Sequence, residues 1–144
     1  ENYGDEEMTA EQVDGLLEEV AEILDVTLRP GTPKIRILVR SLGDIALLAR
    51  RTGGVAGHGT ECGALYFPGA NLVVIPYYSR TMLGHEMAHY LTDHYLPSTP
   101  RRHWERIAQR VEDELPLSAP VARRPSLPDV AARALAVPAV APAN

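Results

Sequence analysis

Cys62 is the only cysteine in this 144-residue chain, so no disulfide can form within one molecule. The fold must therefore be stabilised by a hydrophobic core or by a metal ion. Hydrophobic residues make up 45% of the sequence, and no apolar run approaches the roughly 20 residues of a membrane-spanning helix. This composition indicates one ordinary soluble domain with a modest core and no membrane span.

Charge is distributed unevenly along the chain. The first 25 residues contain ten acidic side chains and neither Lys nor Arg, and we interpret them as the solvated face of a helix. The basic residues elsewhere are scattered and are not interleaved with aromatic residues on one face, which argues against nucleic-acid binding. Because the chain begins at Glu1 and not at a methionine, it suggests a trimmed chain or an exported, processed form that has lost a targeting segment.

Hydrophobic spacing and cap residues predict the order of helices and strands. Thr9 with Gln12 and Ser41 with Asp44 have the pattern of helix caps, and the apolar residues that follow recur at helical spacing. The elements expected in chain order are a helix at 9–26, a strand at 34–39, a helix at 41–51, two short strands at 64–67 and 72–75 forming a hairpin, and helices at 79–95 and 99–115. This order predicts an α+β fold with a small, mostly antiparallel sheet.

Two further segments have distinct compositions. Residues 1–115 are expected to form the folded domain, and residues 116–144, rich in Pro and Ala, an extended tail that docks on the domain or on a neighbouring chain. The glycine-rich segment 53–63 is interpreted as a loop, because it lacks the Lys-Ser/Thr ending of a phosphate-binding loop. We interpret His58 and Cys62 as ordinary loop residues. The weaker alternatives are that His58 contacts the substrate and that Cys62 is a metal ligand.

The segment 84–89 reads Gly-His-Glu-Met-Ala-His and lies inside the helix expected at 79–95. At about 3.6 residues per turn, His85 and His89 leave one face of the helix a turn apart, where both imidazoles can bind one tetrahedral zinc ion. Glu86 lies beside His85 around the helix, where its carboxylate can accept a proton from water without binding the metal. The competing interpretation is a pair of histidines with a helix-stabilising Glu and no metal.

A catalytic zinc ion takes three protein ligands and keeps its fourth position for water. Pro97 ends the motif helix, and the short connection makes the next helix run back beside it. At about 1.5 Å per residue, His89 and Glu105 both lie on the order of 10 Å from this turn, whereas Glu112 and Glu114 would overshoot the metal. Glu105 is therefore the predicted third ligand.

The H-E-x-x-H pattern at 85–89, followed by Glu105, resembles the gluzincin zinc metallopeptidases, the clan that includes thermolysin. It is most similar to the small stand-alone members called minigluzincins, in which an active-site helix, a glutamate helix and a small sheet form nearly the whole protein. Thr92 and Asp93 also resemble the active-site helix of thermolysin. The resemblance spans residues 34–115 and implies a minimal zincin-like catalytic domain.

The resemblance implies a zinc-dependent peptidase that hydrolyses peptide bonds with zinc-activated water. Glu86 would be the general base that takes the proton of the water and passes it to the leaving amine. The implied partner is a peptide or protein substrate, aligned as an extra strand on an edge supplied by 64–67 or 72–75. Ordinary hairpin packing of those two segments is an equal alternative.

The sequence also departs from the family pattern. Many relatives have Glu-Gly at the third ligand and thermolysin-type enzymes an Asp one turn later, whereas this chain has Arg106 and Gln109. His85 must then find another acceptor for its second ring nitrogen or bind zinc less tightly, and Asp93 is either such a partner or a solvated residue. The Tyr or His that stabilises the oxyanion in the family has no clear counterpart. The remaining candidates are Tyr66, Tyr77, Tyr78, His94 and His103.

Three functional classes therefore stay open. The first is an active zinc peptidase, the second a non-catalytic, zinc-stabilised binding or regulatory domain, and the third a latent precursor inhibited by the tail at 116–144. Retention of Glu86 favours the first over the second, because a structural metal site needs ligands but no general base. Sites of the His/His/Glu type also accept divalent ions other than zinc.

Overall fold

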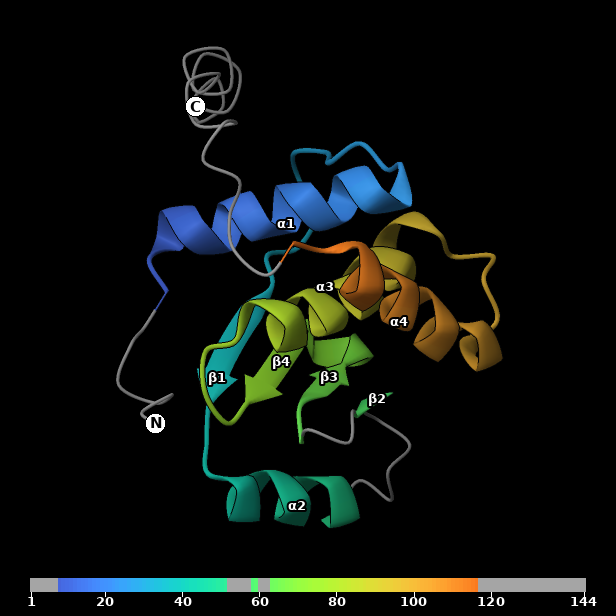
Figure 1. Cartoon of the computed structure of the whole chain (residues 1–144). Coiled ribbons are helices and arrows are strands. Elements are labelled where there is room, and N and C mark those ends of the chain that lie inside the picture. Colours follow the sequence, from blue (N-terminus) through green and yellow to red (C-terminus); the bar gives the residue numbers. More distant parts are fainter. Residues whose placement is uncertain (1–7, 52–57, 60–62, 117–144) are drawn as a thin grey trace.

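The computed structural model describes residues 8–51, 58–59 and 63–116 (Figure 1). Its elements in chain order are α1 (Ala10–Leu24), β1 (Arg36–Val39), α2 (Leu42–Arg51), β2 (His58–Gly59), β3 (Leu65–Phe67), the 3-10 helix η2 (Pro68–Ala70), β4 (Leu72–Ile75), α3 (Arg80–Tyr95), the 3-10 helix η3 (Arg101–His103) and α4 (Trp104–Glu114). The predicted α+β class is confirmed. None of the helices in these described ranges is long and apolar enough to cross a membrane.

Cap residues define the start of the first two helices as the sequence predicts. Gln12 N donates to Thr9 Oγ1 at 3.1 Å and Thr9 N donates to Gln12 Oε1 at 2.7 Å, which completes the capping box of α1. Asp44 N donates to Ser41 Oγ at 3.1 Å at the start of α2. Helix α1 ends at Asp25, whose left-handed φ of 59° closes the last turn.

The strands form one small mixed sheet in the order β1-β4-β3-β2. Strand β4 pairs in parallel with β1 and antiparallel with β3, and the short β2 continues the sheet antiparallel to β3. The expected hairpin between β3 and β4 is confirmed, and its connection ends at Asn71 with a left-handed φ of 51°. The parallel pairing of β1 with β4, beside the antiparallel pairing of β3 with β4, makes the sheet mixed.

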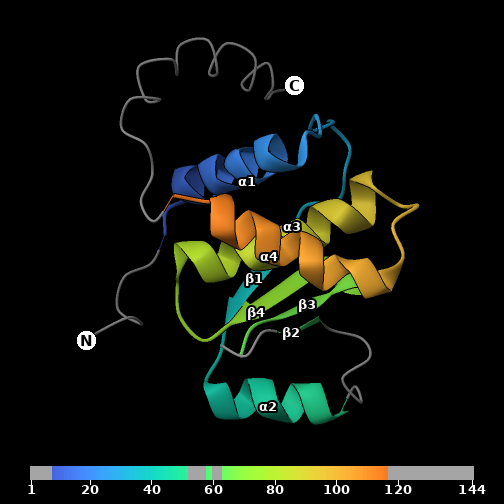
Figure 2. The same ribbon diagram turned by 45° about the vertical axis from the view of Figure 1, so that its right-hand side comes forward.

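Helices cover both faces of the sheet. Because side chains alternate along a strand, Tyr66 and Val73 contact the larger core beneath α1, α3 and α4, whereas Leu65 and Val74 contact Ile45 of α2. Figures 1 and 2 show α2 on one side of the sheet and the three other helices on the opposite side. The sheet is therefore the middle of three layers.

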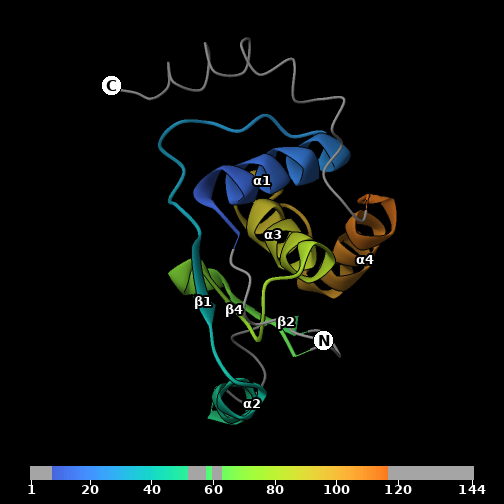
Figure 3. The same ribbon diagram turned by 60° about the vertical axis from the view of Figure 1, so that its left-hand side comes forward.

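Helix α3 is the central helix of the larger layer and is buried from Met82 to Thr92. It lies between α1 and α4 (Figure 3). Gly84 permits this packing, since a Cβ atom there would lie 2.6 Å from Cδ2 of Leu115, the residue that follows α4. The absence of a side chain at this position lets the chain after α4 approach α3 closely.

Two sequence predictions differ from the structure. The helix expected at 99–115 begins as an α-helix only at Trp104, because Pro100 is extended, with φ −63° and ψ 146°, and the next residues form η3. The segment 53–63, expected to be a loop, contributes β2 to the sheet. The tail prediction lies outside the described residues, apart from Pro116, as does Cys62.

Candidate metal centre

The three polar residues of the motif lie on α3 and are buried. His85, Glu86 and His89 are 2%, 0% and 0% exposed. The rings of His85 and His89 have centroids 5.0 Å apart, as expected for residues one turn apart on one helix face. Burying polar groups of this kind is costly unless other groups compensate them, so the residues of neighbouring elements that face them define the site.

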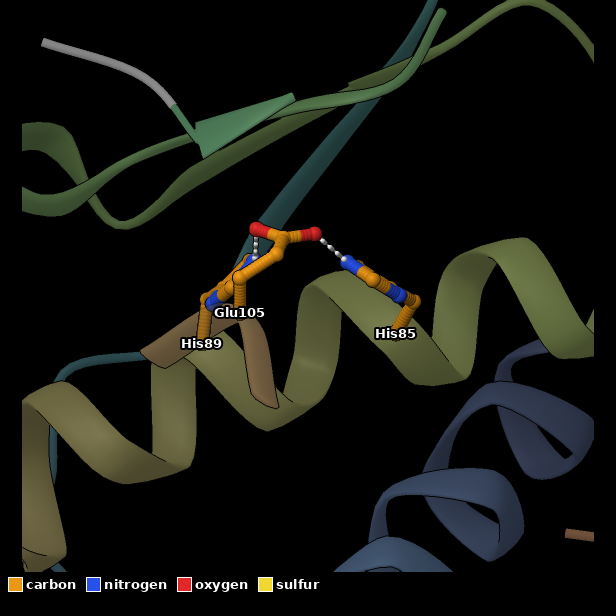
Figure 4. Close-up of side chains that lie close together, drawn as sticks. All are labelled: His85, His89 and Glu105. Carbon is orange, nitrogen blue, oxygen red and sulfur yellow. Dashed lines mark hydrogen bonds and ion pairs between the residues drawn. The ribbon is translucent and has the colours of Figure 1, made fainter. Parts of the chain in front are cut away.

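Glu105, in the first turn of α4, lies across from both histidines (Figure 4). Its Oε2 is 2.7 Å from Nε2 of His85, and its Oε1 is 3.4 Å from Nε2 of His89. One donor atom from each of the three residues lies within 4.8 Å of the other two. The Glu105 side chain is 50% exposed, so the cluster opens to solvent on this side. The structure thus brings together the three residues predicted as metal ligands.

Glu112 also contacts this cluster, and the sequence reasoning missed its role. Its Oε1 lies 2.9 Å from Nδ1 of His85, the ring nitrogen that does not face Glu105. Glu112 is not one of the three residues whose donor atoms converge, but it reaches the far side of His85 because α3 and α4 are antiparallel. The signal in the sequence is the seven-residue spacing from Glu105, which places both carboxylates on one helix face.

Aromatic residues from two other elements enclose His89. The rings of Tyr66 on β3 and Trp104 on α4 have centroids 6.4 and 6.0 Å from that of His89, at interplanar angles of 23° and 25°. The Tyr66 hydroxyl donates to Asp93 Oδ2 at 2.9 Å. Asp93, predicted as a possible partner of a metal ligand, therefore supports His89 through Tyr66, whose ring packs against the His89 ring.

Glu86 is a buried carboxyl group next to the metal-ligand candidates. Neither of its oxygens has a hydrogen-bond partner among the described residues. Burial raises the pKa of Glu86 well above its ordinary value of 4.5, and the negative charges of Glu105 and Glu112 raise it further. A carboxylate with a raised pKa is a stronger proton acceptor than an ordinary carboxylate, as a general base must be.

The pKa shifts of the ligand candidates favour their metal-binding forms. The hydrogen bond to His89 lowers the pKa of Glu105 to about 2, against the opposing effect of partial burial. Burial lowers the pKa of His89. Glu105 is therefore ionised and His89 neutral at pH 7, which are the protonation states that bind a metal ion.

The candidates for an oxyanion-stabilising group are mostly engaged elsewhere. Tyr66 contacts His89, but its hydroxyl already donates a hydrogen bond to a carboxylate, and burial and that bond raise its pKa. His94 bonds to Asn71, and His103 bonds to Arg106. The two remaining candidates pack against the larger core: Tyr77 and Tyr78.

The sheet order corrects the expectation for the substrate-binding edge. The segment 72–75 is β4, which is paired on both sides and therefore cannot be an edge. Strand β3 is paired with β2 through Tyr66 and Leu65, so β2 forms the edge on that side. Tyr66 of β3 contacts His89, so the strand next to this edge lies against the candidate metal centre.

The donor atoms fit a zinc ion. Two imidazole nitrogens and one carboxylate oxygen form a ligand set typical of catalytic zinc, which leaves a further coordination position free. The cluster is buried on the α3 side and open to solvent at Glu105. Beside it lies the Glu86 carboxyl group, which has no hydrogen-bond partner among the described residues. A catalytic zinc site needs a general base of this kind, whereas a structural zinc site does not. His85, His89 and Glu105 are therefore the residues that would hold the ion.

Comparisons with known proteins identify no relative of this chain. No protein-family model matches it, and no curated protein or solved structure matches it. The resemblance to the gluzincins therefore stays a prediction, which rests on the motif residues and on the geometry described above.

Proposed function

We propose that this chain is a zinc-dependent peptidase of the gluzincin type. The observation that carries the proposal is the convergence of His85, His89 and Glu105 beside a buried, unpartnered Glu86. The order of the parts also supports it: a motif helix, an antiparallel glutamate helix and a small sheet with its edge next to the site resemble a minimal zincin-like domain.

The chain's own residues have distinct roles in this proposal. A zinc ion held by the three ligands would lower the pKa of a water molecule and polarise the scissile carbonyl. Glu86 takes the proton of the attacking water on its carboxylate and then delivers it to the amine nitrogen that leaves. The buried position of Glu86, with no competing hydrogen bond, keeps its carboxyl group available for this transfer.

The substrate in this proposal is an extended peptide. Strand β2 forms an edge of the sheet beside the site, and an extended chain can pair with such an edge through backbone hydrogen bonds. The exposure of Glu105 means that the site is open to solvent, which suits a flexible segment of a protein substrate.

The test measures metal content and proteolysis separately. Wild type is compared with Glu105→Ala, Glu86→Gln and the control Glu114→Gln, which changes an exposed residue of α4 paired with Arg110. Metal content is determined by elemental analysis after dialysis, and cleavage is followed with casein. We expect about one zinc per chain in wild type, weakened retention in Glu105→Ala, and full zinc with loss of cleavage in Glu86→Gln.

The outcomes separate the proposal from its alternative. Zinc retention without cleavage by wild type would indicate either the non-catalytic, zinc-stabilised domain or the precursor inhibited by its tail, and cleavage by a chain that stops after Leu115 would select the precursor. Absence of zinc from every variant would overturn the metal site itself. Equal cleavage by wild type and Glu86→Gln would overturn the role of Glu86 as general base.

A further inference from the structure

His85 has two ring nitrogens, and the structure gives each a different carboxylate. Nε2 faces Glu105 Oε2 at 2.7 Å, and Nδ1 faces Glu112 Oε1 at 2.9 Å. The His85 side chain is only 3% exposed, whereas that of Glu112 is 34% exposed. The His85 ring is therefore held at both ends by α4.

A neutral imidazole carries one N–H, so the partner of one nitrogen decides what the other can do. A carboxylate at Nδ1 accepts a hydrogen bond from N–H at that atom. Nε2 is then the nitrogen that can give its lone pair to a metal ion, on the side where Glu105 and His89 Nε2 converge. The same hydrogen bond fixes the rotation of the imidazole ring about its Cβ–Cγ bond.

Other residues of α4 do not supply this contact. Gln109, one turn after Glu105, donates instead to Asp113 Oδ1 at 3.1 Å, and both residues are exposed. Glu114 is engaged with Arg110 on the exposed surface. Glu112 is two turns after Glu105, and the antiparallel course of α4 brings it level with His85.

We propose that Glu112 is the positioning residue of the metal centre: by accepting a hydrogen bond from Nδ1 of His85, it selects the tautomer and ring orientation in which Nε2 binds the metal. This inference rests on the proposed zinc site. It assigns the role to a residue outside the three ligands and the general base, and at a position where the family resemblance does not place an acidic group.

Three variants test the assignment. Glu112→Ala removes the acceptor, Glu112→Gln keeps an acceptor oxygen of the same reach without its charge, and Asp113→Asn is a control on the neighbouring residue. Zinc affinity is measured by competition with a chelator of known affinity. Protonation of the His85 nitrogens is followed by long-range proton–nitrogen NMR spectra, with and without zinc.

We expect Glu112→Ala to weaken zinc binding by about 10- to 100-fold, Glu112→Gln to weaken it less, and Asp113→Asn to leave it unchanged. The NMR spectra of the metal-free proteins should show a proton on Nδ1 in wild type and a mixture of tautomers in Glu112→Ala. A cooperative unfolding transition, measured in the presence of chelator, shows that each variant is folded without zinc. A role only in stability would change that unfolding curve without changing the tautomer.

The failures are distinguishable. If wild type binds zinc and Glu112→Ala binds it within about twofold of wild type, the inference about Glu112 is wrong and the proposed function stands. If the His85 proton lies on Nε2 in zinc-loaded wild type, the inference is wrong as well. If wild type binds no zinc, both are wrong.

Discussion

Tyr66 and Asp93 join the sheet to the motif helix, because the Tyr66 hydroxyl donates a hydrogen bond of 2.9 Å to Asp93 Oδ2. Tyr66 comes from β3, and Asp93 lies on α3, one turn after His89. The bond fixes the Tyr66 ring against the ring of His89. A hydrogen bond that involves neither a proposed ligand nor the proposed general base therefore adds to the core packing that holds the sheet against the candidate metal centre.

Tyr66→Phe should destabilise the protein without abolishing the metal site. The change removes a hydrogen bond to a carboxylate but keeps the ring, so we expect a loss of about 1–2 kcal/mol in the free energy of unfolding. Urea unfolding measures this loss, and an unchanged slope would show that the unfolded state is unaffected. Zinc affinity should change far less than in Glu105→Ala.

A double-mutant cycle provides the control for Tyr66→Phe. Asp93→Asn alone should be destabilising, and the double variant should be less destabilised than the sum of the two single variants, because both changes remove the same bond. Additive effects would show that the bond does not contribute to stability in solution.

Glu86→Gln should stabilise the metal-free protein at neutral and alkaline pH. The folded-state pKa of Glu86 is raised above 4.5, so its contribution to stability is full below pH 4.5 and is lost as pH rises through the folded-state pKa. Gln has no proton to lose. We expect the variant to exceed wild type by more than about 1 kcal/mol at about pH 8, with a smaller difference at about pH 4.

Unfolding by urea in the presence of chelator at both pH values tests this expectation. The control is Glu114→Gln, which makes the same chemical change at an exposed position of α4. A Glu86→Gln variant that is less stable than wild type at alkaline pH would mean that the carboxylate has a stabilising partner in solution. The expected result would show that the proposed general base is held at a cost in stability.

Arg80→Ala should loosen the packing of three elements. Arg80 begins α3, its guanidinium bonds to Glu19 of α1, and its Nε donates to the carbonyl of Pro116 at 2.8 Å. The side chains of Arg80 and Glu19 are only 13% and 12% exposed, so truncation leaves a largely buried carboxylate without its cation. We expect a loss of about 3 kcal/mol in the free energy of unfolding, measured with urea.

The matched control for Arg80→Ala is Arg102→Ala, which removes an exposed arginine. Replacing Glu19 together with Arg80 should recover part of the stability, because no unpaired charge then remains buried. If Arg80→Ala is as stable as wild type, the ion pair does not contribute to the packing of α1 on α3.

Local signals in the sequence were sufficient for much of the fold. The capping box at Thr9 and Gln12, the hairpin of β3 and β4 and the motif helix each depend on residues close together in the chain, and all are present in the structure. The parallel pairing of β1 with β4 and the edge strand β2 depend on contacts between distant segments. Short apolar runs do not specify their neighbours, so the sheet order was not predictable.

The candidate site was likewise predictable only where its residues are related by spacing along a helix. Spacing along two helices places His85, His89 and Glu105 at one level, because helix geometry converts residue number into distance. The partner of Nδ1 of His85 depends on how α3 and α4 are rotated against each other, which the sequence does not specify. Glu112 was therefore judged only by its distance along the helix and was excluded as a ligand without being recognised as a partner.

Trp104 provides an intrinsic probe of the metal centre. It is the only tryptophan in the chain, is buried, and lies 6.0 Å from His89 between ring centroids. Cobalt(II), which sites of this type accept in place of zinc, quenches fluorescence at short range, so we expect quenching that saturates near about one equivalent. Glu105→Ala keeps the contact between Trp104 and His89 but removes a ligand, and it should need a much higher cobalt concentration. Equal quenching of both proteins would place the cobalt away from the predicted ligands.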